Sequence, residues 1–244
     1  MKIGVFDSGI GGFTVAAALY KKRQFELIYL ADQAHLPYGS KDPELLLQLV
    51  SENIKWFQRQ GISTILIACN TVSSLIEELR GLFPNLTLIS IIEETVKQIN
   101  HEKRLLILGT NQTVNSLSYL KLLPNNCDVK QVALPKLASL IEDFASDFEI
   151  STYLNPLLAP FQNEKRRLVL ACTHYPLVLD LIKQAALSEV IEIDYGKLVL
   201  PNSVNGSSLK VFTTGDKVVM ERQLKELYQI EVSVTEVYDE IFIS

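Results

Sequence analysis

Short apolar runs alternate with amphipathic stretches along the chain, and this alternation predicts the fold. The runs Ile3–Phe6, Leu27–Ala31 and Thr64–Ala68 are rich in aliphatic residues, as expected of buried strands. The stretch Asp42–Glu44 supplies a helix N-cap, a proline for the first turn and an acidic residue, so a helix is expected to begin there. Strands that alternate with helices favour right-handed βαβ units and parallel sheets covered on both faces.

An internal repeat divides the chain into two similar parts. Residues Thr64–Thr71 resemble Arg167–His174 at an offset of 103 residues, from 69 to 172. Residues Ile3–Ser8 resemble Leu105–Thr110 at an offset of 102 residues, from 7 to 109. Strand ends that recur at nearly one offset indicate two related α/β units of about 100 residues each.

The fold predicted from this repeat is α/β, with two pseudo-symmetric three-layer α/β/α domains, mainly parallel sheets and the active site in the cleft between them. The first domain is expected to comprise residues 1–93 and 208–244, and the second residues 94–207. The C-terminal piece returns to the first domain. It contains a helix and is expected to end in a strand at Glu231–Val234.

Polar and nucleophilic residues gather where the predicted strands end. Parallel sheets bind ligands beyond the carboxyl ends of their strands. If the two units face each other, these residues converge on one cleft. The residues are Asp7, Ser8, Cys69, Asn70, Thr110, Cys172, Thr173 and His174.

The composition is that of a globular protein and excludes several classes. The 244 residues are 48% hydrophobic and 21% charged, which excludes intrinsic disorder as the main description. A net charge of −5 argues against a nucleic-acid partner. No apolar run reaches the roughly 20 residues needed to span a membrane, and the N-terminus lacks the features of a secretory signal. Three cysteines, an odd count, indicate free thiols in a reducing compartment, so we expect a cytoplasmic protein.

Cys69 and Cys172 are the main candidates for chemistry. A single free cysteine is often only a small buried hydrophobe, but two at equivalent strand ends indicate a shared role. Their spacing does not provide the four ligands of a zinc site, so no metal is expected. A pair of thiols could remove a proton from one face of a carbon and return a proton to the other face, which inverts a stereocentre.

Two other interpretations stay open at this point. Cys172 and His174 could form the nucleophilic pair of a thiol hydrolase or lyase, which leaves Cys69 dispensable. Alternatively, the glycine-rich loop Asp7–Gly12 could hold an anion with its backbone N–H groups in a binding module without catalysis. The same loop is also explained as a tight strand-to-helix turn, with Asp7 as a helix N-cap.

Four further residues have structural or surface interpretations. His35, in the loop before Pro37, is expected to be structural. His101 lies in a polar stretch and Glu142 lies beside an apolar helical stripe, so both are predicted by pattern alone to be solvated. Cys127 lies in a turn-like sequence and is interpreted as incidental.

Taken as a set, the motifs of this chain resemble those of the glutamate racemase family. They occur in the family's order and span nearly the whole chain. The resemblance implies two α/β domains and cofactor-independent interconversion of L- and D-glutamate by two bases, with D-glutamate supplied to peptidoglycan synthesis. The matching segments are Asp7–Val15, Ala31–Asp32, Pro37–Gly39, Ala68–Thr71, Ala171–Leu177 and Phe212–Asp216.

The resemblance also implies roles for individual residues. Cys69 would abstract the α-proton of D-glutamate with the help of Asp7, and Cys172 that of L-glutamate with the help of His174 and Glu142. No cofactor is expected, the partner is the small-molecule substrate glutamate, and a homodimer is the candidate assembly. The implied substrate-binding residues are Asp7, Ser8, Tyr38, Gly39, Asn70, Thr71, Thr110, Thr113, Thr173 and His174.

Overall fold

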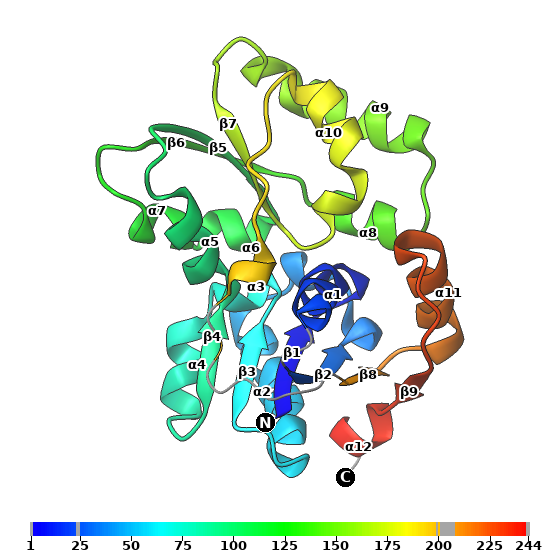
Figure 1. The fold of residues 1–244 in the computed structure, drawn as a ribbon. Helices are drawn as coiled ribbons and strands as arrows, with labels where there is room; N and C mark the ends of the chain where they lie inside the picture. Colours follow the sequence, from blue (N-terminus) through cyan, green and yellow to red (C-terminus); the bar gives the residue numbers. More distant parts are fainter. Residues whose placement is uncertain (1, 23–24, 199, 201–207, 243–244) are drawn as a thin grey trace.

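A computed structural model describes residues 2–22, 25–198, 200 and 208–242 of the chain, and its strands form two sheets (Figure 1). All named strand pairs in these residues are parallel. The first sheet has the order β4-β3-β1-β2-β8-β9 and the second the order β6-β5-β7. The strands are β1 (Lys2–Asp7), β2 (Glu26–Ala31), β3 (Thr64–Ile67), β4 (Thr87–Ser90), β5 (Arg104–Gly109), β6 (Asp128–Ala133), β7 (Arg167–Ala171), β8 (Ser208–Thr213) and β9 (Val234–Glu236).

The predicted internal repeat is confirmed by the strand pairing. The order β3-β1-β2 in the first sheet corresponds to β7-β5-β6 in the second. Gly4 pairs with Ile65, and Leu106 pairs with Leu168, so the same register recurs at offsets of 102 and 103 residues. Equivalent strands therefore end at equivalent places in the two units.

Helices cover the faces of both sheets, as the predicted α/β class requires. The helices are α1 (Phe13–Lys21), α2 (Pro43–Arg59), α3 (Asn70–Ser73), α4 (Ile76–Leu82), α5 (Ile91–Ile99), α6 (Asn111–Asn115), α7 (Ser118–Leu122), α8 (Leu137–Glu142), α9 (Asp147–Leu158), α10 (Leu179–Ala186), α11 (Lys217–Tyr228) and α12 (Tyr238–Phe242). The expected start of α2 is confirmed, because the Asp42 side chain caps it by accepting a hydrogen bond from the Glu44 N–H at 2.8 Å.

One hydrophobic core is continuous between the two sheets. Val5 of β1 and Ile107 of β5 belong to the same buried cluster, which also contains α1, α5 and α11 residues. The outer face of the first sheet packs against α2, and that of the second against α9 and α10. Figure 1 shows α1 and α5 in the region between the sheets. The strand ends of the two units are thereby brought together.

The C-terminal segment returns to the first sheet, since β8 pairs with β2. The domain boundaries at 93/94 and 207/208 stay a prediction, and residues 201–207 lie outside the described residues. The predicted strand at Glu231–Val234 is wrong in position, because β9 covers Val234–Glu236. Ile230 and Val232 alternate as strand residues do, but they pack on the core from an unpaired loop.

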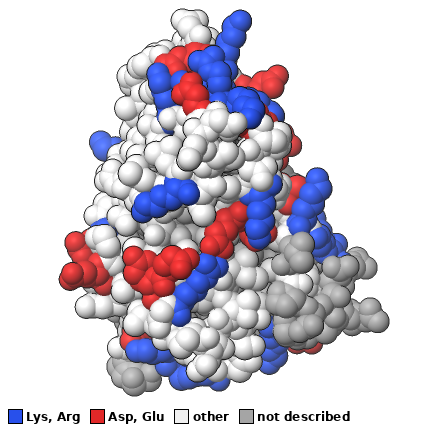
Figure 2. All heavy atoms as spheres, turned by 90° about the vertical axis from the view of Figure 1, so that its left-hand side faces the viewer, with Lys and Arg blue, Asp and Glu red and all other residues white. Residues whose placement is uncertain are grey.

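Charged side chains of both signs are interspersed on the face shown in Figure 2. Ion pairs join several charged side chains of the described residues, as Arg80 does with Glu93 at 2.7 Å. Within the described ranges, no helix combines the length and the apolar character that a membrane crossing needs.

Candidate active site

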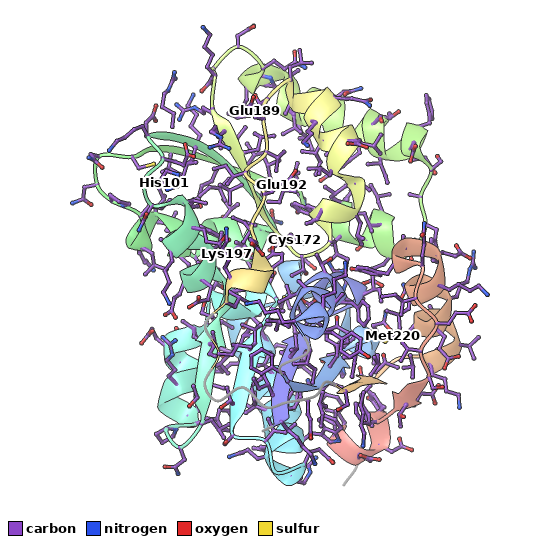
Figure 3. The ribbon with its side chains drawn as sticks, viewed as in Figure 1. His101, Cys172, Glu189, Glu192, Lys197 and Met220 are labelled. Carbon is purple, nitrogen blue, oxygen red and sulfur yellow. The ribbon has the colours of Figure 1, made fainter. Side chains whose placement is uncertain are left out.

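Cys69 and Cys172 both follow the carboxyl end of a strand, β3 and β7 respectively. Both are buried, with exposed fractions of 5% and 7%, and both line one cavity of about 30 Å³. Figure 3 shows Cys172 in the interior between the two sheets, whereas His101 lies at the periphery and is solvated, as predicted.

The cavity brings together most of the residues that sequence reasoning singled out. Besides the two thiols, the predicted residues that line it are Ser8, Tyr38, Gly39, Asn70, Thr71, Thr110, Thr173 and His174. Leu36, Pro135 and Ala138 line it as well. The other three predicted residues, Asp7, Thr113 and Glu142, lie behind the lining and are each hydrogen bonded to a residue in it.

On one side of the cavity, Cys69 lies beside Ser8 and near the carboxylate of Asp7. The Ser8 hydroxyl oxygen is 3.6 Å from the Cys69 sulfur. Burial raises the pKa of the Cys69 thiol to about 12, and the charge of Asp7 adds to this shift. Burial also raises the pKa of Asp7 to about 6, against the opposing effects of the His174 charge and the Gly9 N–H. Cys69 is therefore a protonated thiol at neutral pH, with a carboxylate nearby.

On the other side, Cys172, His174 and Glu142 form a chain of contacts. The Cys172 sulfur lies 3.8 Å from His174 Nδ1, and His174 Nε2 lies 2.6 Å from Glu142 Oε1. Burial opposes the cationic form of His174, but its contacts with Cys172 and Glu142 outweigh burial and hold its pKa well above the usual value. Burial likewise opposes ionisation of Glu142, but the hydrogen bond from His174 holds its pKa below the usual value. This series of contacts can move a proton to and from Cys172.

The prediction that Glu142 is solvated is wrong. Its side chain is only 9% exposed, because groups of the first unit cover it. The Ile10 N–H donates to Glu142 Oε1 at 2.8 Å, and the amides of Gln33 and Gln223 donate to Oε2. Helical periodicity reports only which face of α8 meets its own sheet, so it could not reveal this contact.

The glycine-rich loop approaches the second unit closely. A Cβ at Gly11 would lie 2.5 Å from His174 Nδ1, and a Cβ at Gly9 would lie 2.1 Å from Glu142 Oε1. The loop does bind a carboxylate, as one interpretation held, but that carboxylate belongs to Glu142 of the same chain. Its glycines are therefore needed for the approach of the Cys172 side to the Cys69 side.

Hydroxyl and amide groups form the rest of the polar lining. Thr110 Oγ1 lies 2.9 Å from Thr71 Oγ1 and 3.1 Å from Thr113 Oγ1. The oxygen of the Asn70 amide accepts a hydrogen bond from Tyr119 at 2.7 Å, so its NH₂ group remains the donor for the cavity. Position 39 has room only for glycine, because a Cβ there would lie 2.6 Å from the Cβ of Thr110. Such donors suit a bound carboxylate.

Other features of the molecule do not join this site. His35 is structural, as expected, since its Nδ1 bonds Asp32 Oδ1 at 2.9 Å. Cys127 does not line the cavity. A larger cavity of about 530 Å³ lies between α1 and residues 190–196, but it contains neither of the two strand-end thiols. Among the described residues, no cluster of three or more His, Cys, Asp or Glu residues could hold a metal ion.

Comparison with known proteins identifies the family. The family model described as Asp/Glu/Hydantoin racemase matches residues 14–196. The chain belongs to this racemase family. As a member it is an isomerase, and the resemblance stated from its motifs is confirmed.

Two kinds of relative support the assignment to the racemase family. The glutamate racemase of Helicobacter pylori strain J99 is 30% identical, over 93% of this chain and 98% of that protein. The crystal structure of glutamate racemase isoform RacE1 from Bacillus anthracis is similar with a TM-score of 0.86, at 25% identity and 96% coverage of each chain. The Francisella tularensis glutamate racemase in complex with D-glutamate has a TM-score of 0.85, also at 25% identity and 96% coverage of each chain.

Sequence reasoning missed the groups that support the cavity from behind. Tyr29 donates its hydroxyl hydrogen bond to the carbonyl of Gly9, and Tyr228 donates to that of Ile10 at 3.0 Å. Gln33 and Gln223 bond Glu142. Their partners are far away in the sequence, and we find no local motif that marks them.

Proposed function

We propose that this racemase interconverts L-glutamate and D-glutamate without a cofactor, by proton transfers at Cys69 and Cys172. The observation that carries the proposal is that both thiols line one cavity and each has its own acid–base partner nearby. Asp7 is the acid–base partner of Cys69, and His174, held by Glu142, is the acid–base partner of Cys172. Two bases on opposite sides of one carbon are what inversion of a stereocentre needs.

In the direction from L-glutamate, His174 carries the proton that it shares with the Cys172 sulfur, and the resulting thiolate removes the α-proton of the substrate. Cys69 then gives its S–H proton to the opposite face of the carbanion, which yields D-glutamate. Cys172 is left protonated and Cys69 ionised. To restore the starting forms, Cys172 releases one proton to solvent by way of His174, and Cys69 takes up one proton from solvent by way of Asp7.

The carbanion needs electrostatic help, because its proton is weakly acidic beside an ionised carboxylate. General acid–base transfer supplies a factor of about 10²–10⁴, so donors fixed around the carboxylate must supply more. Ser8, Asn70, Thr71, Thr110 and Thr173 are the side chains we assign to this role. A cavity that excludes water strengthens each of these interactions.

The cavity is small in this structure. A water molecule needs about 10–15 Å³ of such volume, so 30 Å³ holds about two waters and is too small for an amino acid. Contacts between the units, such as Thr173 to Asp7 at 3.0 Å, lie at its border. We therefore propose that the units separate to admit substrate and close around it.

Glutamate is proposed as the substrate because the relatives are named glutamate racemases, one of them in complex with D-glutamate. Aspartate differs by one methylene, which is worth about 1–3 kcal/mol in a pocket. We further propose that D-glutamate formed in the cytoplasm supplies peptidoglycan synthesis. A homodimeric assembly stays a prediction.

A thiol hydrolase is the second candidate, since the Cys172–His174–Glu142 chain has the order of a nucleophile, a base and a carboxylate that orients the base. Polarimetry of dialysed protein with both enantiomers of glutamate and aspartate tests the proposal. We expect each glutamate enantiomer to reach the racemic mixture without added cofactor. Absence of optical change with all four amino acids contradicts the proposal, and hydrolysis of an ester without Cys69 favours the second candidate.

A further inference from the structure

The carboxylate of Glu142 is surrounded by hydrogen-bond donors. Oε1 accepts from His174 Nε2 at 2.6 Å and from the Ile10 N–H at 2.8 Å. Oε2 accepts from Gln223 Nε2 at 2.7 Å and from Gln33 Nε2 at 3.2 Å. Only His174 belongs to the second unit, because Ile10 and Gln33 lie beside β1 and β2, and Gln223 lies on α11.

The two glutamines form an ordered chain that begins at the end of β8. The Thr213 hydroxyl donates to Gln33 Oε1 at 3.0 Å, and Gln33 Nε2 donates to Gln223 Oε1 at 2.7 Å. Gln223 Nε2 then donates to Glu142 Oε2, and to the Glu142 carbonyl at 3.1 Å. Each amide oxygen accepts and each amide nitrogen donates, so this network defines one orientation for both side chains.

This network fixes what Glu142 can do. A carboxylate that receives donors on both oxygens is held ionised and in one orientation. It then holds the Nε2 edge of His174, which leaves Nδ1 facing the sulfur of Cys172. Donors of this kind behind a base–carboxylate pair set the position of the base.

We propose that Gln33 and Gln223 are positioning residues for the Cys172 side of the reaction. Neither glutamine lines the cavity, so both act through Glu142 and His174. The inference rests on the proposed function, in which Cys172 acts on L-glutamate. It adds that the base on this side is assembled only when groups of the first unit reach Glu142 across the boundary between the units.

Gln98 provides a matched control. It also joins distant segments, with its Nε2 donating to the Asp194 carbonyl at 3.2 Å and its Oε1 accepting from the Asp194 N–H at 3.0 Å. It lies away from the cavity that holds the thiols. Gln98→Leu therefore removes two long-range hydrogen bonds without touching Glu142.

The test uses single-thiol backgrounds to separate the two sides of the reaction. In Cys69→Ala protein, exchange of the α-hydrogen of L-glutamate with D₂O reports on Cys172. In Cys172→Ala protein, exchange of D-glutamate reports on Cys69. We expect Gln223→Leu and Gln33→Leu to slow the first exchange by about 10–100-fold. The exchange of D-glutamate at Cys69 should change by less than about twofold in both glutamine variants, since their contacts to Glu142 are remote from Cys69. In Gln98→Leu both exchanges should change by less than about twofold, since the contacts of Gln98 are remote from both thiols.

Equal losses in both backgrounds would show a general structural role and overturn the inference, as would an unchanged rate on the Cys172 side. Gln33→Leu guards against misfolding, because Gln33 is only half-buried whereas Gln223 is 2% exposed. Gln223→Met, which removes the amide donors and keeps a side chain of similar length, should behave as Gln223→Leu does.

A spectroscopic measurement is independent of activity. The chain has three histidines, and the 2.6 Å bond to Glu142 should give the His174 Nε2–H a strongly downfield proton resonance in ¹⁵N-labelled intact protein. We expect this resonance to shift or broaden in Gln223→Leu and to stay unchanged in Gln98→Leu. An unchanged resonance in Gln223→Leu overturns the inference, whereas failure of the proposed function is seen separately, as absence of racemisation by the unaltered protein.

Discussion

Thr173 donates its hydroxyl hydrogen bond to Asp7 Oδ2 at 3.0 Å, which joins the loop after β7 to the end of β1. Asp7 is fully buried at this junction, and its other oxygen accepts from the Gly9 N–H at 3.0 Å. Burial still raises its pKa to about 6, so two hydrogen bonds do not compensate for the loss of water. The carboxylate beside Cys69 is therefore a destabilising group that the proposed chemistry requires.

The first prediction is that Asp7→Asn stabilises the protein at neutral pH while it lowers racemisation. The folded-state pKa of about 6 lies above the ordinary 3.8, so the folded protein binds this proton more tightly. The contribution of Asp7 to the free energy of unfolding is greatest below pH 3.8 and falls by about 3 kcal/mol as the pH rises through 6. The asparagine variant lacks this loss. Urea denaturation should show a gain at pH 8 that vanishes towards pH 4, and a gain independent of pH would contradict the assignment.

The second prediction concerns the two thiols. Cys69→Ser and Cys172→Ser should each lower the rate of racemisation by at least about 10²-fold, because a hydroxyl is a far weaker acid than a thiol. Cys127→Ser should retain the full rate, since Cys127 does not line the cavity. Circular dichroism of the glutamate solution measures the rate. Normal racemisation by Cys69→Ser would remove that thiol from the mechanism.

The third prediction is that Gly11→Ala impairs both stability and activity. The added Cβ would lie 2.5 Å from His174 Nδ1 and 2.6 Å from the His174 backbone nitrogen. Relief of such a clash moves His174 or the loop, at a cost of about 1–3 kcal/mol in unfolding free energy. Gly81→Ala is the control, because a Cβ there meets open space on α4 and should stabilise by about 0.5–1 kcal/mol. Thermal melting and polarimetry compare the two, and a fully active Gly11→Ala would show that the close approach is not needed.

The fourth prediction concerns the carboxylate behind His174. Glu142→Gln keeps the shape but removes the negative charge, so the pKa of His174 should fall, because Glu142 is one of the groups that hold it above its usual value. The rate should fall by about 10–100-fold. An NMR titration of His174 measures the shift. Asp143→Asn, which alters the exposed acidic neighbour, should change neither quantity. A His174 pKa unaffected by Glu142→Gln would argue that the pair is not coupled.

Much of the fold could be predicted because each of these strands can be recognised from its own residues. The buried runs before Asp7, Cys69 and Cys172 are each uniformly apolar, and their recurrence at one offset reveals the two units before any contact is known. Since parallel strands end at the same edge, the residues after them could be expected to converge. The pattern was less informative after α11, where Ile230 and Val232 alternate as in a strand but face the core from a loop.

The groups behind the cavity could not be predicted from local pattern. Glu142 lies beside an apolar stripe on α8 and looks solvated until the loop at Ile10 and the amide of Gln223 are placed over it. These partners are 132 and 81 residues away along the chain. Periodicity describes how a helix packs on its own sheet and says nothing of a second unit that packs on its other side.

The most direct test of the central claim follows hydrogen at the α-carbon of glutamate in D₂O. With L-glutamate as substrate, the account predicts that D-glutamate forms with one deuterium at Cα. The reason is that Cys172 takes the original hydrogen, whereas Cys69, whose S–H exchanges with D₂O, supplies the new one. The measurement is mass spectrometry of the separated enantiomers early in the reaction, with metal chelator present. D-glutamate that carries the original hydrogen from the first turnovers, or no isotope uptake by either enantiomer, would contradict the account.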